Sequence, residues 1–218
     1  MSRKTDLIVL FGEYKGKYEA IVKKIKEVEA SDAYTEVGRE QAVNKVMEDF
    51  SPIVKRYHDT AIESITEGLE ALSRKWKSHS AGRLQDNGYQ TGLSNVFKML
   101  EIGAIREKDD IQNIIDNYKG DYNALAMIKD LLQRSTDEAV KACTFMIPQD
   151  NREKNKRLLE QLMKNVNDQI NIGAVQAASK TWGVNYGLSS VPLALDGMIQ
   201  FVTDFLGQDL ELLDQITR

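Results

Sequence analysis

Several residue types are scarce in this chain. Among 218 residues there are three prolines, two histidines and a single cysteine. One thiol cannot form an internal disulfide, which favours a reducing compartment. The apolar neighbours of Cys143 at positions 145–147 indicate a buried core residue. A catalytic thiolate would need a partner such as histidine.

Long apolar runs and an excess of basic residues are also missing. The longest apolar stretch, residues 191–206, is interrupted by Asp196 and Asp204, so nothing reaches transmembrane length. The run "LIVLF" near the N-terminus is too short for a secretory signal. A formal net charge of −4 argues against a dedicated nucleic-acid-binding domain. We therefore expect a soluble protein, by default cytoplasmic, with no membrane contact.

Helical periodicity runs through almost the whole sequence, and alternating Val/Ile/Thr-rich runs are lacking. The pattern predicts an all-α fold, with a long N-terminal helical hairpin and a bundle of shorter helices. The segment "SHSAGRLQDNG" (residues 78–88) is typical of a linker. We predict an elongated helical hairpin over residues 1–80 and a compact helical bundle over 81–218, which can be continuous with the hairpin as one domain.

The first helix, expected over residues 5–30, carries apolar residues in alternating steps of four and three. This spacing is the heptad seam of a coiled coil. Gly12 and Gly16 weaken the helix, which therefore needs a partner. We predict a stable homo-oligomer, and substitution of aspartate for Ile21 and Ile25 should dissociate it or unfold the hairpin. The interaction residues of this hypothesis are Phe11, Tyr14, Tyr18, Ile21 and Ile25.

The second helix is expected from an N-cap at Thr35 to about residue 78. Its apolar stripe repeats over eleven residues and runs as far as Trp76. Ser51-Pro52 interrupts the stripe. The proline either kinks one helix or begins a new helix capped by Ser51.

Residues 86–104 contain glycines and polar residues that suggest a ligand loop. No Gly-Lys-Ser/Thr ending or preceding strand is present, so neither a phosphate-binding loop nor a dinucleotide turn fits. A helix explains the segment better, with Asp86 or Asn87 as its cap and Gly103 as its left-handed terminus.

Further helices follow the same local signals. One begins at the cap Asp121, and another begins near Ser135 or Thr136 and ends before Pro148. Residues 151–183 are predicted as one long helix. The last helix is expected after Pro192.

The residues that perform chemistry do not form known motifs. His58, His79 and Cys143 have no metal-ligand spacing, and both histidines are expected on the surface. The pair Asp109-Asp110 is explained by a helix N-terminus. No nucleophile motif occurs. We therefore expect a non-enzymatic protein without cofactor or metal.

Two basic clusters support an alternative, because cations interleaved with an aromatic ring are typical of nucleic-acid grips. One cluster surrounds Trp76, and the other lies at the start of a predicted helix. Their residues are Arg74, Lys75, Lys77, Arg83, Arg152, Lys154, Lys156 and Arg157.

The segments "YQTGLSNVFKMLEIGA" (89–104) and "DDIQNIIDNYKGDYNALAMIKDLL" (109–132) carry a family resemblance. Over about residues 1–135 the chain resembles uncharacterised helical proteins encoded in the virion-assembly modules of phages and prophages of Gram-positive bacteria. That family has no assigned activity, so no functional residue carries over. The resemblance implies a role in particle assembly, in the host cytoplasm or the virion.

Two hypotheses follow from the sequence. The first is a helical interaction protein that associates with itself or with other phage structural proteins. The alternative is a helical nucleic-acid-binding or regulatory factor that uses the two basic clusters. Only the alternative predicts steeply salt-dependent binding of DNA or RNA.

Overall fold

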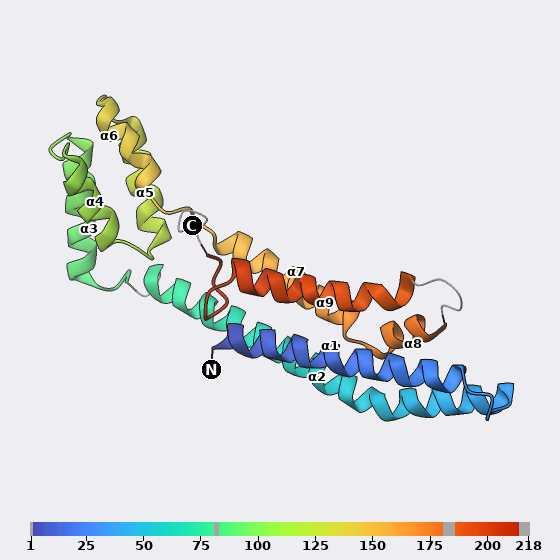
Figure 1. The fold of residues 1–218 in the computed structure, drawn as a ribbon. Helices are drawn as coiled ribbons and strands as arrows, with labels where there is room; N and C mark the ends of the chain where they lie inside the picture. Colours follow the sequence, from blue (N-terminus) through green and yellow to red (C-terminus); the bar gives the residue numbers. More distant parts are fainter. Residues whose placement is uncertain (1, 81–82, 181–185, 214–218) are drawn as a thin grey trace. The chain divides into compact units, whose positions relative to one another are not determined.

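The computed structural model describes residues 2–80, 83–180 and 186–213 and confirms the all-α class (Figure 1). Within these ranges no strand ladder forms, and a single bridge joins Leu206 to Leu212. The elements are α1 (Arg3–Glu29), α2 (Glu36–Ser80), α3 (Asn87–Glu101), α4 (Lys108–Asn117), α5 (Tyr122–Arg134), α6 (Glu138–Ala142), the 3-10 helix η1 (Cys143–Met146), α7 (Arg152–Gln169), α8 (Ile172–Lys180) and α9 (Tyr186–Phe205).

Helix ends follow the capping signals in the sequence. The Thr35 hydroxyl accepts a hydrogen bond from the N–H of Gly38 at 3.1 Å, and the carboxylates of Asp86 and Asp121 cap α3 and α5. Gly103, just beyond α3, has a φ of 69°, which glycine adopts without steric cost. These predictions are confirmed.

Three predicted boundaries are wrong. Residues 151–183 do not form one helix, because the chain breaks after Gln169. The Asn171 side chain accepts from the N–H of Ala174 and donates to the Asn167 carbonyl, both at 2.8 Å. It thus ends one helix and begins the next. The expected end at residue 183 lies outside the described residues.

The other two differences concern α6 and α9. The cap of α6 is Asp137, not Ser135 or Thr136. Helix α9 begins at Tyr186 and includes Pro192, where a start after the proline was expected. Pro52 likewise lies inside a continuous α2, so Ser51 does not cap a new helix.

The chain packs into two compact units. The first contains residues 1–69 and 152–218, and the second contains residues 70–151. The boundary falls inside α2. This division differs from the predicted domains 1–80 and 81–218, because the C-terminal helices pack on the N-terminal hairpin.

In the first unit, α1 and α2 form the predicted antiparallel hairpin. Tyr14 in the middle of α1 stacks with Phe50 (6.4 Å between ring centroids) and meets Tyr57 (5.7 Å). Arg3 at the start of α1 lies 4.0 Å from Glu67, which comes later in α2 than Phe50 and Tyr57. Contacts that move backward along α2 as α1 advances define an antiparallel pair.

Helices α7 and α9 complete a four-helix bundle in this unit (Figure 1). Nε2 of His58 on α2 lies 2.8 Å from Oδ1 of Asn167 on α7. Lys15 on α1 reaches Asp196 on α9 at 2.7 Å. Neighbouring helices run in opposite directions, which is the up-down-up-down topology. The second unit is therefore an insertion into the connection between α2 and α7.

The core of the bundle is apolar and draws on all four helices. Its best-buried side chains are Leu7, Phe11, Tyr14, Tyr18, Ile65, Leu159, Leu162, Val166, Leu195 and Val202.

A short hook, residues 207–213, follows α9 in the same unit. The N–H of Gly207 donates to the Glu211 carbonyl at 2.7 Å, and the N–H of Leu213 donates to the Phe205 carbonyl at 2.9 Å. Asn155 on α7 is buried and joins the hook through its amide. Its Nδ2 donates to the Leu210 carbonyl, and its Oδ1 accepts from the N–H of Leu212, both at 3.1 Å.

The second unit has a core of its own. Cys143 is buried in it, as predicted, and the thiol donates to the Ala139 carbonyl at 3.4 Å. The remaining buried residues are Leu93, Leu100, Ile105, Ile111, Ile115, Tyr118, Ala124, Leu125, Ile128, Leu132 and Val140.

Candidate functional site

The predicted interaction residues lie mostly in the core of the first unit. Phe11 and Tyr14 are 0% exposed, Tyr18 is 1% and Ile25 is 2% exposed. Ile21 is half-buried. The seam therefore packs within the chain, against α2 and the C-terminal helices of the same unit, and a partner cannot reach these four side chains in the folded state.

The seam also buries two phenol groups. The hydroxyls of Tyr14 and Tyr18 have no hydrogen-bond partner among the described residues. Loss of solvent raises the pKa of both groups, because burial disfavours the phenolate. Both tyrosines therefore act as large apolar core residues.

The first basic cluster lies in the second unit, at the end of α2 and just beyond it. Arg74 pairs with Glu70 at 3.5 Å. The guanidinium of Arg83 lies 4.8 Å from the ring centroid of Tyr89. Trp76 is half-buried. Two of the cations thus have partners inside the unit, while Lys75 and Lys77 are exposed.

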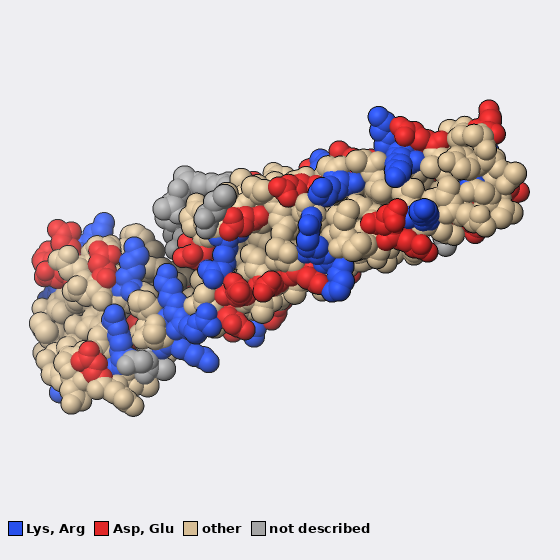
Figure 2. All heavy atoms as spheres, turned by 90° about the horizontal axis from the view of Figure 1, so that it is seen from below, with Lys and Arg blue, Asp and Glu red and all other residues tan. Residues whose placement is uncertain are grey.

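The second basic cluster lies in the first unit, in the first two turns of α7. Lys154, Lys156 and Arg157 are exposed, and Arg152 is half-buried. Lys156 lies 4.0 Å from Glu160. The two clusters belong to different units. On the face that Figure 2 shows, basic and acidic side chains are interspersed.

Both histidines are half-buried, whereas the sequence predicted surface positions for them. His58 bridges two groups, with Nδ1 2.9 Å from Asp59 and Nε2 2.8 Å from Asn167. His79 belongs to the last turn of α2, not to a linker, and an added Cβ at Gly120 would lie 3.2 Å from its Nδ1. Within the described ranges, no three His, Cys, Asp or Glu side chains are grouped as a metal site would require.

Helix α9 has two apolar faces. Its inner face is buried in the bundle through Val191, Leu195, Met198 and Val202, and Leu206 just beyond the helix is buried as well. A second row repeats every four residues and faces outward, formed by Leu193, Gly197, Phe201 and Phe205. An i, i+4 row is a continuous ridge on a helix surface.

The outward row is accessible to solvent. Leu193 is 67% exposed and Phe205 is 44% exposed. Phe201 is half-buried, and its ring stacks on Phe205 with 5.8 Å between centroids and an angle of 24°. Single exposed apolar residues are common, but a continuous row is not. None of the described helices, α9 included, is long and apolar enough to cross a membrane.

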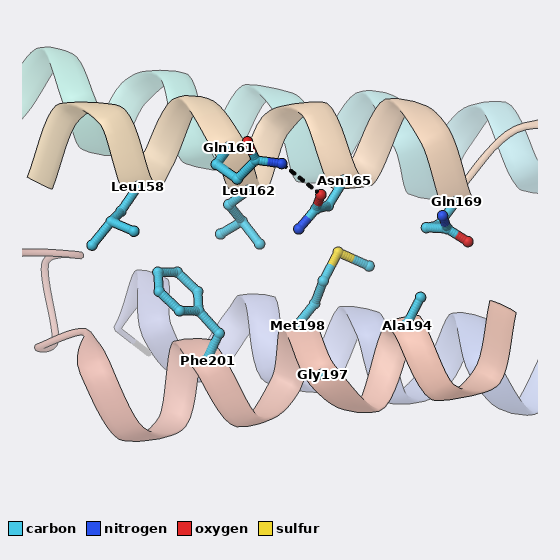
Figure 3. A pocket seen from close by; sticks show the side chains of 9 residues that line it. All are labelled: Leu158, Gln161, Leu162, Asn165, Gln169, Ala194, Gly197, Met198 and Phe201. Atoms are coloured by element: carbon cyan, nitrogen blue, oxygen red, sulfur yellow. Dashed lines mark hydrogen bonds between the residues drawn. The ribbon is translucent and has the colours of Figure 1, made fainter. Parts of the chain in front are cut away.

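A groove runs beside this row, between α7 and α9 (Figure 3). Its volume is about 310 Å³. The side chains of Leu158, Leu162, Met198 and Phe201 extend into the space between the two helices. The complete lining is Leu158, Gln161, Leu162, Asn165, Gln169, Ala194, Gly197, Met198 and Phe201.

The lining is uncharged, although 28% of the chain is charged. Polar groups come from α7 as amides, and Gln161 donates to Asn165 at 3.0 Å. Opposite them, the α9 side of the groove is lined by the small residues Ala194 and Gly197, which leave space between the two helices. The result is an apolar groove with a neutral polar rim, suited to an apolar helix or chain segment.

Periodicity in the sequence predicts a single apolar face for this last helix, through Leu195, Ile199, Val202, Phe205 and Leu206. Phe205 is instead 44% exposed and belongs to the outer row. The signal for the other face was present in the four-residue spacing of Leu193, Gly197, Phe201 and Phe205. A glycine within that row hides the pattern, because it contributes no apolar side chain. Comparison with known proteins gives no matching family model, curated protein or solved structure.

Proposed function

We propose that this chain is a non-enzymatic helical interaction protein that docks other protein through the outer row of α9 and the adjoining groove. The observation that carries the proposal is the second apolar row, of which Leu193 and Phe205 are 67% and 44% exposed. Burying such a row would release about 25 cal/mol for each Å² of apolar surface.

The chemistry of the groove favours a protein partner over a small polar ligand. Its rim offers amides, with one already hydrogen-bonded pair, Gln161 and Asn165. A charged metabolite would find no counter-charge in the lining. An amphipathic helix placed along α7 and α9 would cover the row with its own apolar side chains, which is the helix-in-groove mode of recognition.

The biological setting that we propose is virion assembly. Its support is the resemblance of residues 89–104 and 109–132 to helical proteins of phage assembly modules. The four-helix bundle offers a helical surface for docking, and such a role requires no catalytic residue.

The alternative, a nucleic-acid-binding or regulatory factor, has weaker support. Arg74 and Arg83 have partners inside their unit. The two clusters, one around Trp76 and one at Arg152–Arg157, lie in separate units. Exposed Lys75 and Lys77 are the residues through which this alternative is tested.

Site-specific photo-crosslinking tests the proposed function. A photo-reactive amino acid replaces Leu193 in the full chain, within the native host, and a matched variant carries it at Val37. Val37 is also an exposed apolar residue, at 64%, but lies on α2 outside the groove. The proposal expects a defined protein adduct from position 193 and none from position 37. Equal or absent adducts from both positions would overturn it.

A further inference from the structure

We infer that the partner of the groove between α7 and α9 is an amphipathic helix whose polar flank is acidic. This inference rests on the proposed function and names the chemistry of the partner. Three features of α7 support it: which charged residues border the groove, how these residues are paired, and where they lie along the helix.

Charged side chains border the uncharged lining, mainly on the α7 side. Residues three and four positions apart are neighbours on a helix surface. Arg157 and Lys164, for example, lie four positions before and three positions after Gln161 of the lining. The charged residues of α7 at this spacing from a residue of the lining are Lys154, Arg157, Lys164 and Asp168. The border on α7 thus has three cations and one acid.

The α9 side of the groove differs in charge. Its one charged residue at the same spacing is Asp204, three positions after Phe201 of the lining. The two sides of the groove therefore have opposite character, basic on α7 and weakly acidic on α9. A helix in the groove would turn its acidic residues toward α7 and neutral or basic residues toward the end of α9.

The three cations on α7 are available to a partner. Lys154, Arg157 and Lys164 are all exposed, and none of them forms an ion pair within the described part of the chain. Lys156, which does not border the groove, instead lies 4.0 Å from Glu160. Carboxylates of a partner would therefore meet cations that no described residue already neutralises.

The position of Lys154 along α7 also indicates a role outside the monomer. It lies in the first turn of the helix, which begins at Arg152. The helix dipole favours acids at this end and disfavours cations, so Lys154 does not serve the stability of α7. Residues that break a local rule in this way are typical of functional positions.

An acidic helix fits this surface better than a nucleic acid does. Both would bring negative charge to the three cations. Only a helix also brings apolar side chains, and the surface beside the cations includes Leu158, Phe201 and the exposed Leu193. Phosphates would leave this apolar area uncovered, whereas a helix would bury it.

Two synthetic amphipathic peptides test the inference on the full chain. Both are helical with leucine on one face, and their flanks carry glutamate in one peptide and lysine in the other. Fluorescence anisotropy of the labelled peptides measures their affinities. The wild-type chain should bind the glutamate peptide at least ~10-fold more tightly than the lysine peptide. This difference should shrink as the salt concentration rises.

Reversal of the three charges tests whether they select the partner. The triple variant Lys154→Glu, Arg157→Glu, Lys164→Glu should fold, because all three residues are exposed and acids suit the start of α7. It should prefer the lysine peptide at least ~3-fold. The matched control, Lys17→Glu with Lys24→Glu, reverses two exposed cations of α1 and should keep the wild-type preference.

Leu193→Asn tests the apolar part of the contact without a change of charge. Leu193 is 67% exposed, so the variant should fold. Both peptides should bind it at least ~3-fold more weakly than they bind the wild-type chain, because less apolar surface is buried.

The outcomes separate this inference from the proposed function. Equal affinity for the two peptides overturns the acidic partner, while a specific adduct from position 193 would keep the docking role. A glutamate preference that the triple variant retains, or that the α1 control loses, overturns the assigned surface.

Two further results would also overturn the inference. A single-stranded oligonucleotide that needs the three cations, but not Leu193, would assign them to nucleic acid instead. If neither peptide binds, the acidic partner is refuted, and if position 193 also gives no specific adduct, the proposed function is refuted with it.

Discussion

Leu210 lies directly against Gly68. A Cβ atom at position 68 would come within 2.7 Å of the Leu210 Cδ1 atom. Leu210 is fully buried and has a φ of 66°, in the left-handed region that leucine rarely adopts. The hook after α9 thus holds a strained residue in place, and the missing side chain on α2 makes room for it.

Gly68→Ala and Gly16→Ala should therefore change the free energy of unfolding by different amounts or in opposite directions. Both replace a helical glycine, which by itself stabilises by about 1 kcal/mol. At Gly16 an added Cβ meets nothing within 4 Å, so the gain should appear in full. At Gly68 the new methyl group displaces Leu210, and crowding of this kind costs about 1–3 kcal/mol.

Urea unfolding of both variants checks this prediction. The Gly16 variant should be more stable than the Gly68 variant by at least ~1 kcal/mol. Equal stability would show that Leu210 does not occupy the space beside Gly68.

Asn155→Ala should destabilise the first unit by about 2–3 kcal/mol. The substitution leaves the Leu210 carbonyl and the Leu212 N–H without their partner, and unsatisfied buried groups are costly. Asn165→Ala is the control on the same helix, because Asn165 is only half-buried and should change stability by less than about 0.5 kcal/mol. Thermal melting followed by circular dichroism measures both. A change at Asn155 no larger than at Asn165 would refute the role of this amide.

Ile25→Asp should unfold the first unit without producing a folded monomer. Ile25 is 2% exposed within the chain's own hairpin, and burial of an unpaired carboxylate costs more than about 3 kcal/mol. Val9→Asp is the control on the same helix, since Val9 is 47% exposed. Circular dichroism measures whether each variant is folded, and sedimentation measures its mass. A helical, folded Ile25 variant of lower mass would mean that the seam packs between chains.

Tyr89 gives the second unit a contribution to stability that disappears at alkaline pH. Burial, together with the 2.6 Å hydrogen bond to Asp121, raises its pKa from 10.0 to about 12. Since the folded state favours the neutral phenol, the contribution is complete below about pH 10, the ordinary pKa of tyrosine. It is lost as the pH rises toward 12.

Phenolate absorbance and stability measured over this range test the prediction. Tyr89→Phe should remove one titration step near pH 12 and reduce the fall in stability between pH 10 and 12. An unchanged titration curve in the variant would show that Tyr89 is not the group that ionises there.

Association with DNA or RNA should show little dependence on salt. Counterion release predicts a steep loss of binding with salt only when several phosphates are contacted. With Arg74 and Arg83 engaged inside their unit, we expect a slope equivalent to no more than ~1 phosphate contact. Fluorescence anisotropy of labelled oligonucleotides measures it. A steep slope that Lys75→Glu and Lys77→Glu abolish would establish the alternative function instead.

The elements and their caps could be predicted because they depend on neighbours in sequence. Helical periodicity and the caps at Thr35, Asp86 and Asp121 act over three or four residues. The burial of Cys143 followed from apolar neighbours. The prediction of one helix over residues 151–183 was wrong because a single side chain, that of Asn171, ends one helix and begins the next.

The candidate site could not be predicted in the same way. Periodicity marks a face as apolar but does not say whether another helix of the chain covers it. The rows of α1 and of α9 look alike in this respect. The α1 row is buried by other helices of its own unit, and the outer row of α9 remains partly exposed.

The sequence by itself determined an all-α chain, the places where most of its helices begin and end, and the existence of a seam that must be covered. Only the tertiary structure decided what covers it. Helices α1, α2, α7 and α9 form one bundle with residues 70–151 inserted. The physical reason is that such packing depends on contacts like Lys15 with Asp196, whose partners are far apart in the chain and leave no local pattern.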